Sequence, residues 1–296
     1  MREKYLPPKV KRVSTREKKI LKTRKIVLTI SGILICALII FPLIWIIPNA
    51  FREKRELFVL NDISFFPKNP TLDNFIGVFE ADVNGANFLR AMGVTFLVAV
   101  LATITSLFVN MLCGYSLARI NFPGKKILWP LLLFPMFIPG ITIMLTSIRV
   151  VNILNMVDTI FVLFVPGMAN AYQIFFFRQF YLDIPVNIEE AAMIDGSSRI
   201  GIFFKIFLPM STTPMIIIGA GTFMGAWNSF VWPTLTITEN AGLVQMMQII
   251  QSLNDMYSNN YGVVIAATLM SLVIPTTVFA IFEKKIVEGI ALTGMK

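Results

Sequence analysis

Six long apolar runs are the feature that most constrains how this chain can fold. Each run is close to or longer than the roughly 20 residues that a helix needs to cross the hydrocarbon core of a bilayer. The runs are 26–48, 91–118, 127–148, 153–177, 206–226 and 261–282. With 56% hydrophobic and 15% charged residues, the chain has more apolar surface than one soluble core could bury. The sequence therefore predicts an all-α integral membrane protein with six transmembrane helices.

The net charge of +9 is concentrated at the amino terminus. Residues 1–25 contain eleven Lys or Arg and two Glu, whereas the rest of the chain has 15 basic and 15 acidic residues. A basic tail directly before an apolar run is typical of the cytoplasmic end of a membrane span, and it favours that interpretation over a nucleic-acid-binding arm. The first run is long and has no small-residue cleavage site after it, so we expect an uncleaved signal anchor.

The loop charges predict the orientation of the spans. The short loop 118–126 and the tail 283–296 each contain three Lys or Arg, which places them in the cytoplasm. Segment 227–260 contains neither Lys nor Arg and is expected outside. Segment 49–87 is also expected outside, although its mixed charges argue weakly against that placement. We therefore expect both termini in the cytoplasm of a multi-pass protein of the bacterial cell (inner or plasma) membrane.

A polar elbow is expected between spans four and five, on the cytoplasmic side. Asn187 is a candidate N-cap for the short acidic helix "IEEAAMID". Gly196 can adopt positive φ at a bend, and Ser197 or Ser198 can cap a second helix. From these residues alone the segment could also be an interfacial helix that only anchors a loop.

The spacing within this elbow resembles the EAA motif of ATP-binding-cassette (ABC) importer permeases. The consensus EAA-x3-G-x9-I-x-L-P is matched at every position, from Glu190 through Gly196 to Pro209. Further segments are similar to the smaller permease subunit of carbohydrate importers of the maltose-transporter type: "TLDNF" (71–75), "GYSLARINFPGKK" (114–126), "AWNSFVWP" (226–233) and "EGIALTGMK" (288–296). The resemblance covers most of the chain, and the EAA spacing is its most specific part.

The resemblance implies that the elbow is a coupling helix that docks on an ATPase subunit. The implied docking face is Glu190, Ala191 and Ala192 with the bend at Gly196, while Glu189 and Asp195 are either further contacts or solvated residues. The implied partners are a second homologous permease, an ABC ATPase dimer, an extracytoplasmic solute-binding protein and a sugar or oligosaccharide. ATP and Mg would bind the ATPase, with no cofactor on this chain.

The sequence lacks the residues that other energy sources or catalysis would need. It has no phosphate-binding loop and no histidine, and Asp158 is the only charge within the six runs. Cys36 and Cys113 lie inside apolar runs and offer neither a disulfide framework nor a metal site. We therefore expect a transport subunit without enzymatic activity, driven by a separate ATPase. Only the elbow argues against a passive channel or scaffold.

Solute contacts are less well indicated. Trp227, Asn228 and Phe230 combine aromatic rings with an amide, which suits a sugar, although an interfacial aromatic belt is an equal alternative. By resemblance, the outside loop 234–260 reaches the solute-binding protein. Import of a non-sugar solute stays open, because importers of other solutes share the EAA motif.

The chain thus divides into three regions. Residues 1–25 form a basic cytoplasmic tail, residues 26–282 form the six-span domain with the EAA loop at about 185–209, and residues 283–296 form a cytoplasmic tail. Gly289 and Gly294 suggest that this last tail is flexible. In similar permeases the tail inserts between the ATPase subunits, and the resemblance implies the same here.

Overall fold

A computed structural model of the protein describes residues 15–56, 64–83, 85–238, 240–257 and 260–293. These residues are almost entirely helical where they are regular, and the sole β-type pairing among them is an isolated bridge between Val83 and Ala86. The predicted all-α class is therefore confirmed. Three helices contain a stretch long and apolar enough to cross a membrane on its own: α1 (Thr15–Ala50), α3 (Phe88–Arg119) and α13 (Tyr261–Thr293).

The other predicted spans are broken helices. The chain bends by 107° between residues 137 and 140, by 47° between residues 167 and 171, and by 78° between residues 210 and 212. Prolines lie at or near these breaks and remove the backbone N–H that a continuous helix would need, for example Pro139 directly before the second helix of the first pair. Six spans result only if each bent pair counts as one, so the six-span topology and the cytoplasmic termini remain predictions.

The broken spans and the connecting segments consist of shorter elements. These are α2 (Asp73–Glu80), α4 (Lys125–Leu133), η2 (Phe134–Phe137), α5 (Gly140–Ile153), η3 (Ile160–Leu163), η4 (Val165–Gly167), α6 (Ala171–Leu182), α7 (Val186–Ile194), α8 (Arg199–Ile202), the π-helical turn η5 (Phe203–Phe207), α9 (Leu208–Met210), α10 (Thr212–Trp227), α11 (Val231–Thr236), η6 (Ala241–Leu243) and α12 (Met246–Met256).

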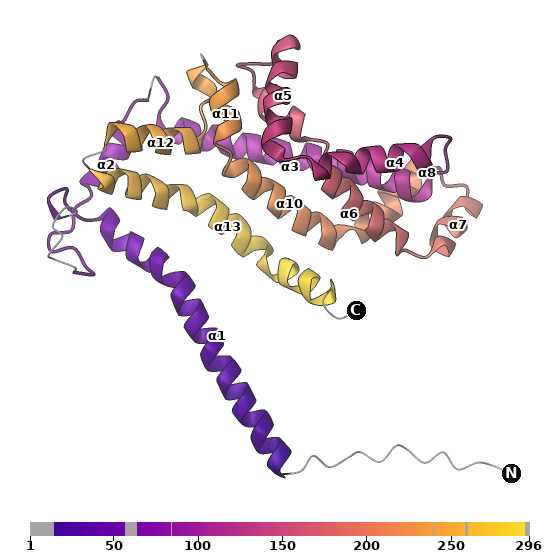
Figure 1. The fold of residues 1–296 in the computed structure, drawn as a ribbon, viewed down its shortest axis with the longest axis horizontal. Coiled ribbons are helices and arrows are strands. Elements are labelled where there is room, and N and C mark those ends of the chain that lie inside the picture. Colours follow the sequence, from indigo (N-terminus) through magenta and orange to yellow (C-terminus); the bar gives the residue numbers. More distant parts are fainter. Residues whose placement is uncertain (1–14, 57–63, 84, 239, 258–259, 294–296) are drawn as a thin grey trace.

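Helix α3 is the central element of the molecule. It packs against α6 and α10, while α13 packs against α10, α2, α12 and α1. Figure 1 shows α2 and α12 gathered at one end of this bundle and α7 and α8 at the other, with the end of α13 pointing toward the α7 side. The elbow is therefore separated from α12 by the length of α3.

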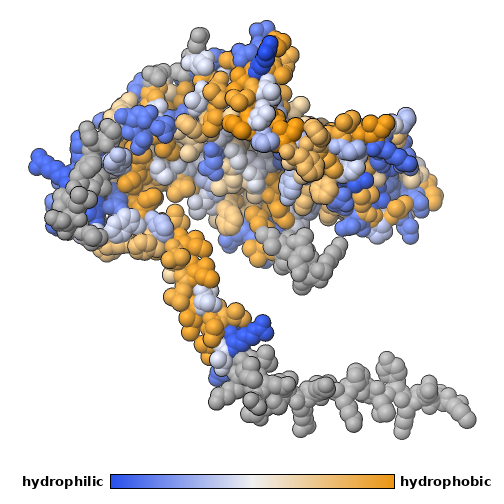
Figure 2. All heavy atoms as spheres, in the orientation of Figure 1, coloured by the Kyte–Doolittle hydropathy of each residue, from blue (hydrophilic) through white to orange (hydrophobic). Residues whose placement is uncertain are grey.

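Helix α1 diverges from the bundle and touches it mainly through α13 (Figure 1). None of its most apolar stretch is buried, and Figure 2 shows apolar side chains along most of its visible length. Such exposure on a helix of this length suits contact with lipid or with another membrane subunit.

Two apolar cores lie at opposite ends of α3. The α12 core joins α2, α12, α13 and the start of α3, and it includes Val78, Phe88, Met246, Ile249, Leu253 and Ala266. The elbow core joins the end of α3 to α6, α8 and η5, and it includes Met111, Tyr115, Phe177, Tyr181, Phe203 and Phe207. The elbow core is thus the more aromatic of the two.

Two connecting segments differ from the sequence-based expectation. Segment 234–260, expected to be a loop, contains α12, which buries Met246, Ile249 and Leu253 at helical spacing. The tail after residue 282 was expected to be flexible, but α13 continues without a break to Thr293. Residues 1–14 of the predicted basic tail (1–25) and residues 294–296 of the carboxy-terminal tail lie outside the described residues, and residues 15–25 form the start of α1.

Candidate functional site

The elbow predicted from the sequence is present. Helix α7 is followed by Gly196, whose φ of +80° is the left-handed conformation that glycine adopts readily. Ser198 then caps α8, because its Oγ accepts the Gly201 N–H at 3.1 Å. The predicted cap at Asn187 is wrong. Pro185 occupies the position before α7, and Asn187 already lies in the first turn, since proline supplies a restricted φ and needs no hydrogen-bond acceptor for an N–H.

The predicted coupling residues divide into an exposed and an inward-facing set. Glu190, Ala191, Asp195 and Gly196 are exposed at the tip of the elbow. Ala192 is half-buried and packs against the elbow core. Apolar side chains surround the exposed set, with Ile194 86% and Ile200 70% exposed. Exposed apolar side chains of this kind mark a candidate docking surface for another protein. The role of these residues in docking stays a prediction.

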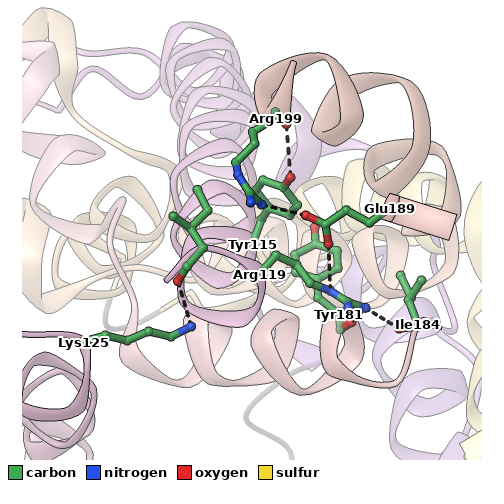
Figure 3. Close-up of polar contacts among 8 residues, drawn as sticks. Tyr115, Arg119, Lys125, Tyr181, Ile184, Glu189 and Arg199 are labelled. Atoms are coloured by element: carbon green, nitrogen blue, oxygen red, sulfur yellow. Dashed lines mark hydrogen bonds and ion pairs between the residues drawn. The ribbon is translucent and has the colours of Figure 1, made fainter. Parts of the chain in front are cut away.

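Glu189 is turned into the protein, away from that surface. Only 6% of its side chain is exposed, and it lies between two arginines (Figure 3). Its Oε1 accepts a hydrogen bond from Arg199 Nη1 at 2.9 Å, and its Oε2 lies 3.8 Å from Arg119 Nε. A buried carboxylate is tolerated when it is paired in this way. Glu189 therefore links α7 to both α8 and the end of α3.

Arg119 connects the elbow to the rest of the bundle. Its side chain is 6% exposed, and its Nη2 donates to the backbone carbonyls of Tyr181 and Ile184 at the end of α6 (Figure 3). Its guanidinium also lies over the Phe207 ring, 5.2 Å from the centroid. This one side chain thus joins α3, on which it lies, to the end of α6, to α7 and to η5.

Aromatic packing fixes the second helix of the elbow against α3. The Tyr115 hydroxyl donates to the Arg199 carbonyl at 3.1 Å, and the Tyr115 ring lies 5.3 Å from that of Phe203 and 4.9 Å from that of Phe207. These contacts and the Glu189 pairs attach both arms of the elbow to α3. A displacement of the elbow would therefore be transmitted to that helix.

A polar network lies deeper in the bundle, at the break before α6. Asn110 of α3 donates to the Met168 carbonyl at 3.1 Å and accepts the Asn170 N–H at 2.9 Å, so it satisfies backbone groups that the break leaves free. Gln173 accepts from Asn110 at 3.0 Å and donates to Thr222 of α10 at 3.0 Å. Within a membrane such groups need partners from the protein or from a water-filled cavity.

The three candidate solute contacts are placed differently. Trp227 is 2% exposed and stacks on Phe223 with ring centroids 6.1 Å apart, so its ring is not accessible to a solute in this conformation. Asn228 and Phe230, just past the end of α10, are exposed. Their contact with a solute stays a prediction. Among the described residues, no cluster of three His, Cys, Asp or Glu could hold a metal ion.

Residues 110–284, more than half of the chain, match the family described as the binding-protein-dependent transport system inner membrane component. The chain belongs to this family. The resemblance to ABC importer permeases and the placement in the cell membrane are thereby confirmed.

Relatives match along almost the whole chain. The arabinooligosaccharide transport permease AraQ of Halalkalibacterium halodurans is 31% identical over 272 residues, which is 91% of this chain and 95% of that protein. AraQ of Bacillus subtilis is 26% identical over 92% of this chain and 96% of its own length. The sn-glycerol-3-phosphate permease UgpE of Escherichia coli is 28% identical over 86% and 91% of the two chains.

Solved structures share the fold. A chain of a bacterial ABC transporter that imports the acidic polysaccharide alginate superimposes with a TM-score of 0.75 at 18% identity, covering 93% of this chain and 99% of that one. A second structure, of an alginate ABC transporter in complex with an alginate-bound periplasmic protein, gives a TM-score of 0.58 at 15% identity. At this identity the likeness shows the fold alone.

Sequence reasoning missed Arg119 and the Asn110 network as parts of the site. Arg119 was interpreted only as a charge that orients the loop 118–126. Its position directly before a turn and 70 residues before Glu189 gives no local signal of their contact. Asn110 offered a weak signal, since an amide in the middle of an apolar run needs a partner.

Proposed function

We propose that this chain forms half of the membrane pathway of an ATP-driven importer for a sugar or oligosaccharide. The observation that carries the proposal is that the elbow has an exposed tip and is attached to the end of α3 through its buried charges. The chain also belongs to a binding-protein-dependent transport family. The AraQ relatives support a sugar as solute. The UgpE relative supports a second candidate, a phosphorylated non-sugar solute.

The elbow would couple transport to ATP hydrolysis on a separate ATPase dimer that binds ATP and Mg. Glu190 and its exposed neighbours would contact the ATPase, and Arg119 and Glu189 would carry the movement to α3 and α6. A second permease would complete the pathway. An extracytoplasmic binding protein would deliver the solute, which is supported by the structure of the alginate transporter in complex with its periplasmic protein. Family membership favours this function over a passive channel or an enzyme.

The experiment is to purify the tagged chain from its membrane in mild detergent and to identify the proteins that accompany it. We expect an ATPase and a second multi-span subunit, with ATP hydrolysis stimulated by the loaded binding protein. Glu190→Lys places a cation on the exposed tip, and we expect about a tenfold loss of that stimulation. Glu80→Lys makes the same change at an exposed site on α2 and should leave it unchanged.

A chain that purifies alone, or a complex in which the two variants behave alike, would contradict coupling through the elbow. Uptake by proteoliposomes that hold the complete complex should also require ATP. Uptake without ATP would instead support a passive channel.

A further inference from the structure

A cavity of about 180 Å³ lies where α3, the 3₁₀ turns before α6, α10 and the start of α12 meet. Its wall includes Phe164, Gly167, Thr222, Gly225, Ser229 and Gln245. Ala102, near the middle of α3, also lines it, which places the cavity about halfway along that helix. The cavity is separate from the elbow and contains none of the three predicted solute contacts.

The polar groups in the wall are hydroxyls and one amide. Thr222 Oγ1 donates to the Ile218 carbonyl and accepts from Gln173, which leaves one of its two acceptor sites free. Ser229 adds a second hydroxyl. None of the described residues that line the cavity carries a charge. The wall can therefore hydrogen-bond to a neutral polar molecule but cannot neutralise an ionised one.

Gln245 supplies the amide of the wall. The residue is 1% exposed and faces Gln248 across the first turn of α12 in the arrangement of a capping box, its own N–H donating to Gln248 Oε1 at 2.9 Å. In that arrangement the Gln245 side chain also accepts the backbone N–H of Gln248, which fixes the amide at the wall of the cavity. An amide oxygen can accept two hydrogen bonds, so Oε1 keeps one acceptor site for a bound hydroxyl.

The wall also has room for a ligand. Gly225 on α10 and Gly167 at the break could each carry a Cβ atom that meets nothing within 4 Å. The backbone between Gly167 and Ala171 is not helical, and non-helical backbone at membrane depth is found where it is buried in protein or lines an aqueous cavity. Phe164 adds an aromatic ring on which the apolar face of a sugar could stack.

We infer that this cavity is a subsite for an uncharged, hydroxyl-bearing ring of the transported solute. The inference rests on the proposed function and narrows it, because a neutral sugar fits the wall and an acidic one does not. Burial of a phosphate or carboxylate group here would leave its charge without a partner among the residues of this chain that line the cavity. The partner permease would cover the open side of the cavity.

Gly225→Leu tests the subsite, with Gly221→Leu as the matched control. Gly221 lies one turn earlier on α10, has nothing within 4 Å of its Cβ position and does not line the cavity. The complete complex in proteoliposomes is given labelled arabinotriose as a neutral probe and trigalacturonate as an acidic one. We expect at least a tenfold loss of arabinotriose uptake in Gly225→Leu and less than a twofold change in Gly221→Leu.

Ser229→Ala provides a second variant that removes a hydroxyl without adding bulk. It should raise the KM for arabinotriose several-fold while the co-purification of the subunits stays unchanged. Equal uptake in the two leucine variants, together with an unchanged KM in Ser229→Ala, would overturn the subsite and leave the proposed function standing. Preferential uptake of trigalacturonate by the unaltered complex would overturn the neutral-solute assignment. Uptake of neither probe would contradict the sugar-import function and this inference with it.

Discussion

The two ends of α3 are held by different kinds of interaction. At the α12 core, neutral side chains bond to backbone groups: Thr95 Oγ1 accepts the Met246 N–H at 2.8 Å, and Asn74 Nδ2 donates to the carbonyls of Ala50 and Arg52 at 2.9 and 2.8 Å. At the elbow core, a buried carboxylate lies between two arginines and large aromatic rings surround it.

This difference in interactions indicates that the elbow end of α3 keeps a fixed arrangement more strongly than the α12 end does. A neutral hydrogen bond contributes roughly 1 kcal/mol and can be exchanged for one to water. A buried charge that loses its partner costs several times more, so the cluster strongly disfavours arrangements that separate Glu189 from Arg119. We therefore expect the elbow to move as a unit with the end of α3, and the α12 end to rearrange more easily.

The largest effect is expected when the buried charge is removed. Glu189→Gln leaves the buried Arg119 without its anionic partner, and we expect a loss of about 3 kcal/mol in the free energy of unfolding. For a chain of this size the loss corresponds to a fall in Tm of about 5 °C, measured by thermal unfolding in detergent.

Glu190→Gln is the matched control for this prediction, because it makes the same change one residue later at an exposed site. It should leave Tm within about 1 °C, since exposed substitutions seldom change stability by more than about 0.5 kcal/mol. Equal Tm values for the two variants would show that the buried cluster does not stabilise the elbow.

A smaller effect is expected at the α12 end. Asn74→Ala removes two hydrogen bonds from a buried amide and should cost about 2 kcal/mol. Asn152→Ala, on the exposed face of α5, removes one amide and should change stability by less than about 0.5 kcal/mol. A cost for Asn74→Ala above that of Glu189→Gln would reverse the proposed order of the two ends.

The smallest effect is expected at the bend of the elbow. The Cβ atom that Gly196→Ala adds has no other atom within 4 Å. The cost of this substitution is therefore the backbone strain of a positive φ, about 1 kcal/mol. Gly32→Ala, in the middle of α1, also meets nothing and should be neutral or slightly stabilising, because alanine favours a helix. If both variants gave the same Tm, the left-handed bend would not be a constraint on the elbow.

The elbow was predictable because its signals are local. A glycine that adopts positive φ and a serine that caps the next helix act within a few residues, and both are found where expected. The prediction of a cap at Asn187 was wrong because Pro185 restricts the backbone two residues earlier. Helix α7 therefore begins at Val186, before Asn187. The helix in segment 234–260 was missed because its apolar spacing is short and interrupted by amides.

The sequence by itself determined the membrane class, the elbow and the family, because these depend on run length, residue type and spacing. Only the tertiary structure decided that Glu189 faces inward while Glu190 faces outward, and that Trp227 is buried while Asn228 is exposed. Adjacent residues on a helix point about 100° apart, so the face that becomes buried depends on neighbours distant in the chain. The contact between Arg119 and Glu189 arises from the same packing, because α6 packs back along α3 and places α7 beside the end of α3, where the two charges meet.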